Sequence, residues 1–277
     1  MNKAVNFFHS RPGVIAAASL ILLLTAAAAL APLLAPRDPN AVDLEKINRP
    51  PAREHWFGTD DKGRDVFSRV LHGARVSLGI GLAATALALA IGTTAGLLGG
   101  YFGGALDHAL QVVVDITLAF PSLLLAIGIT VVLRPGFFTV FLALALAGWA
   151  SLARLVRGEV IALKQREYVL AARSVGASPS RIIRRHILPN CLPILLVASS
   201  LKVGGFILGE AALSFLDLGV RPPAATWGFM ISAGREYLRS APWMTVFPGL
   251  ALAATVLAFN LLGDALRDHL DPKLEVR

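Results

Sequence analysis

Acidic side chains gather in residues 55–65, where closely spaced carboxylates could hold a metal ion. Asp60, Asp61 and Asp65 supply three carboxylates in one short stretch, and basic residues are interleaved with them. Opposite charges at this spacing neutralise one another, which favours ion pairs over a vacant cation site. We therefore expect a solvated ion-pair network here, and no metal site on the chain.

The same stretch contains two glycines spaced as in a phosphate-binding loop. Gly58 and Gly63 are followed by Arg64 and Asp65, where such a loop requires Lys and then Ser or Thr. An aspartate there would repel phosphate, so we reject this site. The chain also lacks the metalloprotease motif H-E-x-x-H, the hydrolase motif G-x-S-x-G and a Cys/His cluster. The sequence thus predicts no catalytic residue and no cofactor on this chain.

Three carboxylates lie in or beside apolar segments, where an ionisable side chain is a functional candidate by default. They are Asp115, Glu210 and Asp264. A polytopic membrane enzyme could use them, but they belong to different segments and have no second motif beside them. Asp115 lies near the start of its segment, so we interpret it as an anchor at a helix end.

A polar stretch, residues 167–189, stands between two long apolar runs and is rich in arginine; we call it the elbow. Its first half has helix-forming composition, and Gly176 is placed to end that helix in a left-handed cap. Ser178 and Pro179 are typical of the start of a second helix. Pro189 is expected to stop that helix.

The second helix of the elbow is expected to be amphipathic. One stripe contains Ile182, Ile183, His186 and Ile187, and the other contains Arg181, Arg184 and Arg185. One interpretation is a basic surface lying on anionic lipid headgroups. The other is a docking surface for a protein. The residue pattern alone leaves both open.

The composition predicts an all-α polytopic membrane protein. The chain has 277 residues, of which 55% are hydrophobic, and its mean hydropathy is +0.65. Such values exceed those of an ordinary soluble domain. The net charge of +8 is grouped between apolar runs, which argues against nucleic acid as a partner. The single cysteine, Cys191, excludes an internal disulfide.

The apolar runs are long enough to cross a bilayer, and we expect six transmembrane helices. The first run exceeds the apolar core of a signal peptide and is read as uncleaved. Pro121 is expected to kink the third. Lys and Arg are divided almost evenly between the two sides, so charge does not decide the orientation. The expected spans are residues 13–34, 76–98, 109–133, 138–156, 191–212 and 243–262.

Several connecting features follow from local patterns. An amphipathic helix with Val66, Phe67, Val70, Leu71 and Ala74 on one stripe, capped by Asp60 or Asp61, should lie in the membrane interface and lead into the second span. Gly92, Gly96 and Gly100 should let another helix approach closely. We also expect a short helix at residues 229–238, and an interfacial belt position for Trp227 and Trp243.

The elbow resembles the cytoplasmic EAA-type loop of binding-protein-dependent ABC transporter permeases. Ala171, Ala172, Gly176, Leu188 and Pro189 are in register with that pattern, whereas Leu170 replaces its Glu and His186 replaces an Ile. In the family this loop docks into a cleft on the ATPase subunit. The resemblance implies that the ATPase-coupling residues are Leu170, Ala171, Ala172, Gly176, Arg181, Ile182, Ile183, Arg184, His186, Ile187, Leu188 and Pro189.

Four further strings resemble the second permease of dipeptide, oligopeptide and nickel importers. They are HWFGTDDKGRDVFSRVLHGARVSL, VDITLAFPSLLLAI, EAALSFLDLG and FNLLGDALRDHLDP, and they extend from His55 to Pro272. Asp217 stands where that family usually has Gly. The resemblance implies the type I ABC importer permease fold, with residues 1–75 as first helix and external loop. Residues 76–277 would be the core permease domain, with its coupling loop at 160–190.

The resemblance also implies the partners and the location. It implies a heterodimer with a paralogous permease, two ATPase subunits that carry ATP and magnesium, and an extracytoplasmic solute-binding protein. The chain would be a non-catalytic subunit in the bacterial inner membrane, in contact with lipid, with both termini cytoplasmic. We expect dipeptides or oligopeptides as the solute, with nickel or another small solute as the alternative. An ion-coupled carrier would need paired intramembrane ions and inverted repeats, which are not evident.

Overall fold

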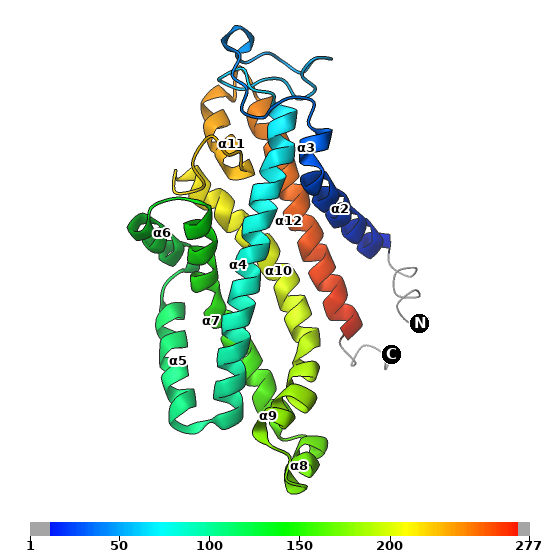
Figure 1. The fold of residues 1–277 in the computed structure, drawn as a ribbon, viewed down its shortest axis with the longest axis vertical. Coiled ribbons are helices and arrows are strands. Elements are labelled where there is room, and N and C mark those ends of the chain that lie inside the picture. The colour runs from blue at the N-terminus through cyan, green and yellow to red at the C-terminus, as the bar shows by residue number, and fades with distance from the viewer. Residues whose placement is uncertain (1–11, 271–277) are drawn as a thin grey trace.

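The computed structural model describes residues 12–270, and these form a bundle of long helices (Figure 1). The helices α4, α7, α10 and α12 run side by side, with α2 against α12 and with α5 and α6 beside α7. No strand occurs among the described residues beyond one isolated bridge between Thr59 and Asp65. The elements are α2 (Pro12–Ala29), α3 (Ala31–Leu34), η1 (Leu44–Lys46), α4 (Val66–Phe102), α5 (Gly104–Ala119), α6 (Ser122–Leu133), α7 (Phe137–Lys164), α8 (Glu167–Ser174), α9 (Pro179–Ile182), η2 (Ile183–Ile187), α10 (Leu188–Phe215), α11 (Trp227–Gly234), η3 (Arg235–Tyr237) and α12 (Trp243–Leu270).

Four stretches of helix are long and apolar enough to cross a membrane, and the bent pair α5–α6 supplies a fifth candidate. The four are Val66–Phe102, Phe137–Lys164, Pro179–Phe215 and Trp243–His269. The stretch expected as the first span corresponds to α2 and α3, and its apolar helix at Val14–Ala29 is shorter than the others. A polytopic all-helical membrane architecture is therefore confirmed, with four to five candidate spans among residues 12–270.

Helix α4 begins at a side-chain cap and continues without a break for 37 residues. Asp65, rather than the expected Asp60 or Asp61, caps it by accepting from the backbone N–H of Ser68 at 2.8 Å. The amphipathic stretch expected in the interface is the first part of this same helix. Its apolar residues Val66 and Val70 pack on α11 and on the start of α12, which explains the amphipathic pattern without a separate surface helix.

The core of the bundle lies where α4 packs along α7. Small residues dominate the contact, including Ala84 and Ala88 on α4 and Ala143 and Ala150 on α7, all fully buried. An added Cβ at Gly96 would lie 2.7 Å from the carbonyl oxygen of Ala153. The four-residue glycine repeat therefore brings the two backbones into contact, as predicted.

The segment expected as one kinked span is instead two helices. α5 and α6 meet at 91° across the break at residues 120–121. Phe120 is extended (φ −96°, ψ 138°), as a residue before proline prefers. Pro121 also lacks the N–H that would have continued the ladder of α5, so the chain turns sharply where a milder kink was expected.

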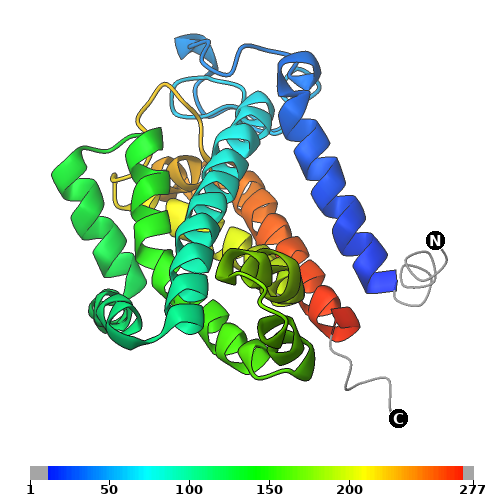
Figure 2. The ribbon, with the colours of Figure 1, turned by 60° about the horizontal axis from the view of Figure 1, so that its bottom comes forward.

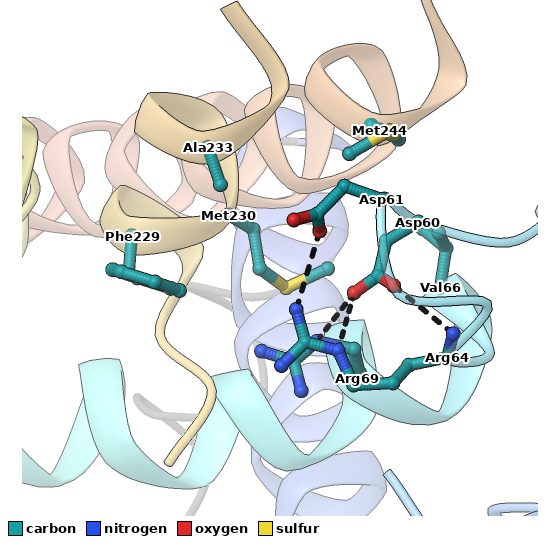
Figure 3. A pocket seen from close by; sticks show the side chains of 9 residues that line it. All are labelled: Asp60, Asp61, Arg64, Val66, Arg69, Phe229, Met230, Ala233 and Met244. Carbon is teal, nitrogen blue, oxygen red and sulfur yellow. Dashed lines mark hydrogen bonds and ion pairs between the residues drawn. The ribbon is translucent and has the colours of Figure 1, made fainter. Parts of the chain in front are cut away.

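The long loop before α4 is held by a buried ion-pair network, as the interleaved charges predicted (Figure 3). Arg64 contacts Asp60 at 2.7 Å, Arg69 contacts the same carboxylate at 3.5 Å, and both arginines are buried. His55 lies 2.8 Å from Asp65. The network is more deeply buried than the solvated one that was expected, and it joins this loop to α4. No cluster suited to a metal ion occurs in residues 12–270.

The two tryptophans expected at a lipid interface both donate hydrogen bonds within the protein. Trp227 is 1% exposed, and its indole N–H donates to the carbonyl of Val70 at 3.0 Å. Trp243 donates in the same way to Thr59 at 3.0 Å. The belt prediction is therefore wrong for Trp227, because the polar indole nitrogen is satisfied by the turn of α4 on which it packs. The short helix expected at residues 229–238 is present as α11 and η3.

Candidate functional site

The elbow lies at one end of the bundle, and the loop of residues 35–65 lies at the other end (Figure 1). Figure 2, with the elbow end turned forward, shows its short helices in front of the long ones. The elbow consists of α8, α9 and the π-helical turn η2, which runs into α10. A polar surface thus projects from one end of an apolar bundle.

Gly176 ends α8 as the sequence predicted. Its φ is +80°, and its N–H donates to the carbonyl of Arg173 at 3.0 Å, while that of Ala177 donates to Ala172 at 3.1 Å. These two bonds define a Schellman motif, in which a left-handed residue reverses the chain and satisfies the last carbonyls of a helix. The break between the two elbow helices is confirmed at this residue.

The start of the second helix agrees with the prediction in position but differs in its chemistry. Ser178 is extended and Pro179 occupies the first turn of α9, yet the hydroxyl of Ser178 makes no capping bond. That hydroxyl lies 3.4 Å from the hydroxyl of Ser180. Proline alone sets the first turn here, since its fixed φ suits the helix and its missing N–H would be free in any case.

The expected stop at Pro189 is wrong. Residues Pro179–Phe215 form one apolar helical stretch, with Pro189 in the first turn of α10. The preceding turn is widened, because the N–H of Leu188 donates to Ile183, five residues back. A π-turn contains one residue more than an α-helical turn. In a regular helix the ring of Pro189 would clash with the carbonyl four residues before it, and the π-turn lies at this place. The elbow is therefore joined by continuous helix to α10.

The apolar stripe of the second elbow helix faces the protein's own interior. Ile182 is 1% exposed and Ile187 is fully buried. They pack in a cluster with Val156 and Val160 of α7 and with Leu195 of α10. This packing fixes the elbow to the bundle, so these isoleucines are not free to contact a partner.

The predicted site residues divide by exposure. Ile182 and Ile187 are buried, and Ala172, Ile183, His186 and Leu188 are half-buried. The others are exposed, namely Leu170, Ala171, Gly176, Arg181, Arg184 and Pro189. The outward surface of the elbow thus combines arginines with the outer side of α8.

Two exposed apolar side chains of the elbow were missed by the sequence reading. Val175 is 84% exposed and Tyr168 is 43% exposed, beside Leu170 at 45%. The signal was present, because these residues are apolar yet lie outside the stripe that packs inward. These three side chains add apolar area to the otherwise polar outer face of the elbow.

Replacement of Gly176 tests whether the reversal of the chain matters for activity. An added Cβ would meet nothing within 4 Å, so only the left-handed backbone opposes a side chain. A β-branched residue costs about 1–2 kcal/mol in that conformation, whereas Asn adopts it more readily. We expect Gly176→Val to lower transport several-fold at unchanged membrane content, and Gly176→Asn to stay within about twofold of wild type. Equal transport by both variants would show that the reversal is dispensable.

The three intramembrane carboxylates are not brought together into a catalytic group. Asp115 of α5 pairs with Arg154 of α7 at 2.5 Å. Glu210 of α10 is fully buried and accepts hydrogen bonds from Ser77 at 3.0 Å and Ser214 at 2.7 Å. Asp264 lies exposed on α12. Two of the three therefore have structural partners, and the enzyme alternative loses its candidate residues.

Comparisons with known proteins agree with this arrangement. Residues 75–276 match the family described as binding-protein-dependent transport system inner membrane component. The oligopeptide transport system permease protein of Bacillus subtilis is 43% identical over 92% of this chain and 84% of its own length. The nickel transport system permease protein of Escherichia coli K12 is 44% identical over 98% of both chains. A glutathione transport system permease protein of Pectobacterium atrosepticum is 44% identical over 94% of this chain and 87% of its own.

The fold is also shared with a solved structure. An inward-facing form of the MetNI methionine ABC transporter aligns with a TM-score of 0.59 at 19% identity, covering 73% of this chain and 96% of that one. The shared fold agrees with the family match and with the relatives above 40% identity. The chain belongs to the family of binding-protein-dependent transport system inner membrane components.

Proposed function

We propose that this chain is one of two permease subunits of an ABC importer, and that its elbow receives the motion of a separate ATPase. The observation that carries the proposal is the elbow itself. It presents exposed apolar and basic side chains outward, while its buried isoleucines fix it to α7 and α10. A surface built in this way can receive a force and transmit it.

The family membership places the chain among membrane components of transport systems, and its relatives are named permease proteins. As a permease subunit it is not an enzyme, and the energy source is a partner. We propose that two ATPase subunits bind ATP and magnesium on one side of the membrane, and that a solute-binding protein docks on the other. A paralogous permease would complete the path, with lipid around both.

The mechanism follows from the continuity of the elbow with α10. Rigid elements transmit displacement better than loops, and alternating states of a transporter are commonly rigid-body movements. Closure of the ATPases would push the elbow, and the helical stretch Pro179–Phe215 would tilt as one body. Because α10 packs on α4, α7 and α12, its tilt would change access to the path from inward-open to outward-open.

We propose six membrane crossings with the elbow in the cytoplasm. They are α2 with α3, α4, the bent pair α5–α6, α7, the stretch that includes α10, and α12. Helices α2 and α12 each have one end near the loop of residues 35–65 and run from there toward the elbow end (Figure 1). An even number of crossings would place both termini on the elbow side, with the 35–65 loop outside.

Peptides are our proposed solute. Relatives with comparable identity are named for oligopeptides, dipeptides and glutathione. Nickel is the second candidate, since a relative named for nickel is equally similar. Against a bare metal ion, residues 12–270 contain no group of His, Cys, Asp or Glu side chains that could hold one.

The experiment is ATP-driven uptake by the reconstituted complex. The permease pair and its ATPases are placed in vesicles with ATP inside, and the binding protein is added outside with a labelled dipeptide. We expect uptake that requires ATP and the binding protein, and that stops when the ATPase is inactivated. Uptake that persists without ATP but follows a proton or sodium gradient would contradict the proposal and favour an ion-coupled carrier.

A further inference from the structure

An open cleft of about 500 Å³ lies between α7, α10 and the start of α6. Its walls are mostly apolar or small, and they include Leu152 and Leu155 of α7 with Leu201 of α10. One charged residue, Lys202, is among those that line it. The cleft opens at the side of a helical bundle whose long helices are candidate membrane spans.

Lys202 carries a charge that no partner neutralises in this part of the protein. Its ammonium lies 5.6 Å from the ring centre of Phe206, and no carboxylate of residues 12–270 is within ion-pair distance of it. Glu210 lies farther along the same helix, but it accepts hydrogen bonds from Ser77 and Ser214. An unpaired charge within a membrane span is costly, and such residues characteristically mark a substrate path.

The cleft is shaped around this lysine. A Cβ added at Gly148 of α7 would lie 2.4 Å from the ring of Phe206 and 3.7 Å from the ammonium of Lys202. Glycine at this position lets the ring of Phe206 lie against the backbone of α7, with the ammonium of Lys202 nearby. Because Gly148 has no side chain, nothing at this position fills the cleft beside Lys202.

The break between α5 and α6 adds to the positive potential. Helix α6 begins at Ser122, which also lines the cleft, and no side chain caps this end of the helix. Free backbone N–H groups give the start of a helix a partial positive charge. Broken helices with their N-terminal ends directed at anionic substrate groups are a recurring feature of transporters. The ammonium of Lys202 and the first turn of α6 are both positively charged, and both belong to the same cleft.

We propose that this cleft is a subsite of the translocation path that binds a carboxylate of the transported solute, with Lys202 as its cationic partner. The proposal rests on the proposed transport function and deepens it by naming the chemical class of solute. A peptide carries a terminal carboxylate and fits this requirement. A bare divalent cation is repelled by the same ammonium.

The first test is uptake of labelled dialanine by the reconstituted complex. We expect Lys202→Gln to lower the initial rate about tenfold, and Lys202→Arg to stay within about threefold of wild type because it keeps the charge. The amount of each variant in the membrane and its copurification with the ATPase subunits serve as controls for folding and subunit assembly, and both should match wild type. Wild-type uptake by Lys202→Gln would overturn the proposal, as would equal losses in the two variants.

The second test measures the charge preference of the cleft without any transported solute. Ser151, exposed on the same cleft, is replaced by Cys in the assembled complex. Its rates of reaction with an anionic sulfonate thiol reagent and a cationic trimethylammonium reagent are then compared by mass spectrometry of this chain. The unaltered chain, in which Cys191 is buried, gives the background.

We expect Lys202→Gln to lower the anion-to-cation rate ratio at Ser151→Cys roughly fivefold. An unchanged ratio would contradict an anion subsite, whatever the uptake results. If the ratio falls but the wild-type complex takes up no dialanine, the peptide assignment fails while the carboxylate subsite stands. The two assays therefore separate failure of this inference from failure of the proposed function.

Discussion

Replacing Leu170 and Val175 together by glutamine lowers ATP-driven uptake at least about tenfold while the amount of protein in the membrane stays at the wild-type level. Both side chains are exposed, Val175 at 84% and Leu170 at 45%, so their replacement removes little packing inside this chain. Burial of an apolar side chain in a partner's cleft contributes about 1.5–3 kcal/mol. A loss of 1.4 kcal/mol corresponds to about tenfold in binding.

The matched control introduces glutamine at two arginines of the elbow in place of the two apolar residues. Arg173 and Arg184 are also exposed, and an exposed ion pair contributes about 0–1 kcal/mol. We expect Arg173→Gln with Arg184→Gln to keep uptake within about threefold of wild type. The opposite ranking, with the arginine pair inactive and the apolar pair active, would show that the elbow acts through charge, on lipid or on acidic side chains.

A third variant separates docking from folding. Ile182 is buried in the cluster that fixes the elbow to α7 and α10. Aspartate there would bury a charge, so we expect Ile182→Asp to reduce the amount of stable protein. A fall in uptake caused by misfolding is thereby distinguished from the loss of coupling expected at Leu170 and Val175.

The second large effect is expected at the glycine contact between α4 and α7. A Cβ at Gly96 would lie 2.7 Å from the carbonyl oxygen of Ala153 and from the Cβ of Val156. The first of these atoms is backbone, so the helices must separate to admit a side chain. Overpacking of a core costs about 1–3 kcal/mol or more. We expect Gly96→Leu to abolish the monodisperse peak of the detergent-solubilised complex.

Gly79 of the same helix provides the comparison. A Cβ there would lie 3.8 Å from the ring of Phe137, an ordinary contact distance. Gly79→Leu should give a wild-type elution profile and a melting temperature within about 2 °C of wild type. If Gly96→Leu behaves in the same way as Gly79→Leu, the close approach of α4 to α7 does not hold the fold together.

Local signals predicted the parts of this fold that depend on neighbours in the sequence. A glycine after a helix-forming run predicted the reversal at Gly176, and its φ of +80° confirms it. The four-residue glycine repeat predicted a close helix contact, which α7 supplies. Interleaved charges predicted ion pairs at Asp60 and Arg64, and these form at 2.7 Å. In each case the signal lies in a short stretch of sequence, although the contact between α4 and α7 joins distant segments.

The parts that the sequence left undecided depend on contacts between distant segments. Pro189 signals a helix end, but a widened turn before it lets the helix continue. An isoleucine stripe indicates that one face is covered without naming the cover, which is α7 and α10 of the same chain. A tryptophan near a helix end suits a lipid interface equally well, yet Trp227 packs against α4. The spacing of apolar residues shows which face of a helix is covered, but it does not show which segment or protein covers that face.

The central claim is that the elbow contacts an ATPase subunit. The direct test is to identify which subunit lies next to Val175 in the assembled transporter. Val175→Cys is treated with a short reagent that has one thiol-reactive end and one photoreactive end, in membranes that contain the whole complex, and the products are identified by mass spectrometry. Val42→Cys, exposed on the loop at the other end of the bundle, is treated in parallel. We predict that Val175→Cys is joined to an ATPase subunit and that Val42→Cys is not. An ATPase adduct at Val42→Cys, with none at Val175→Cys, would contradict the account.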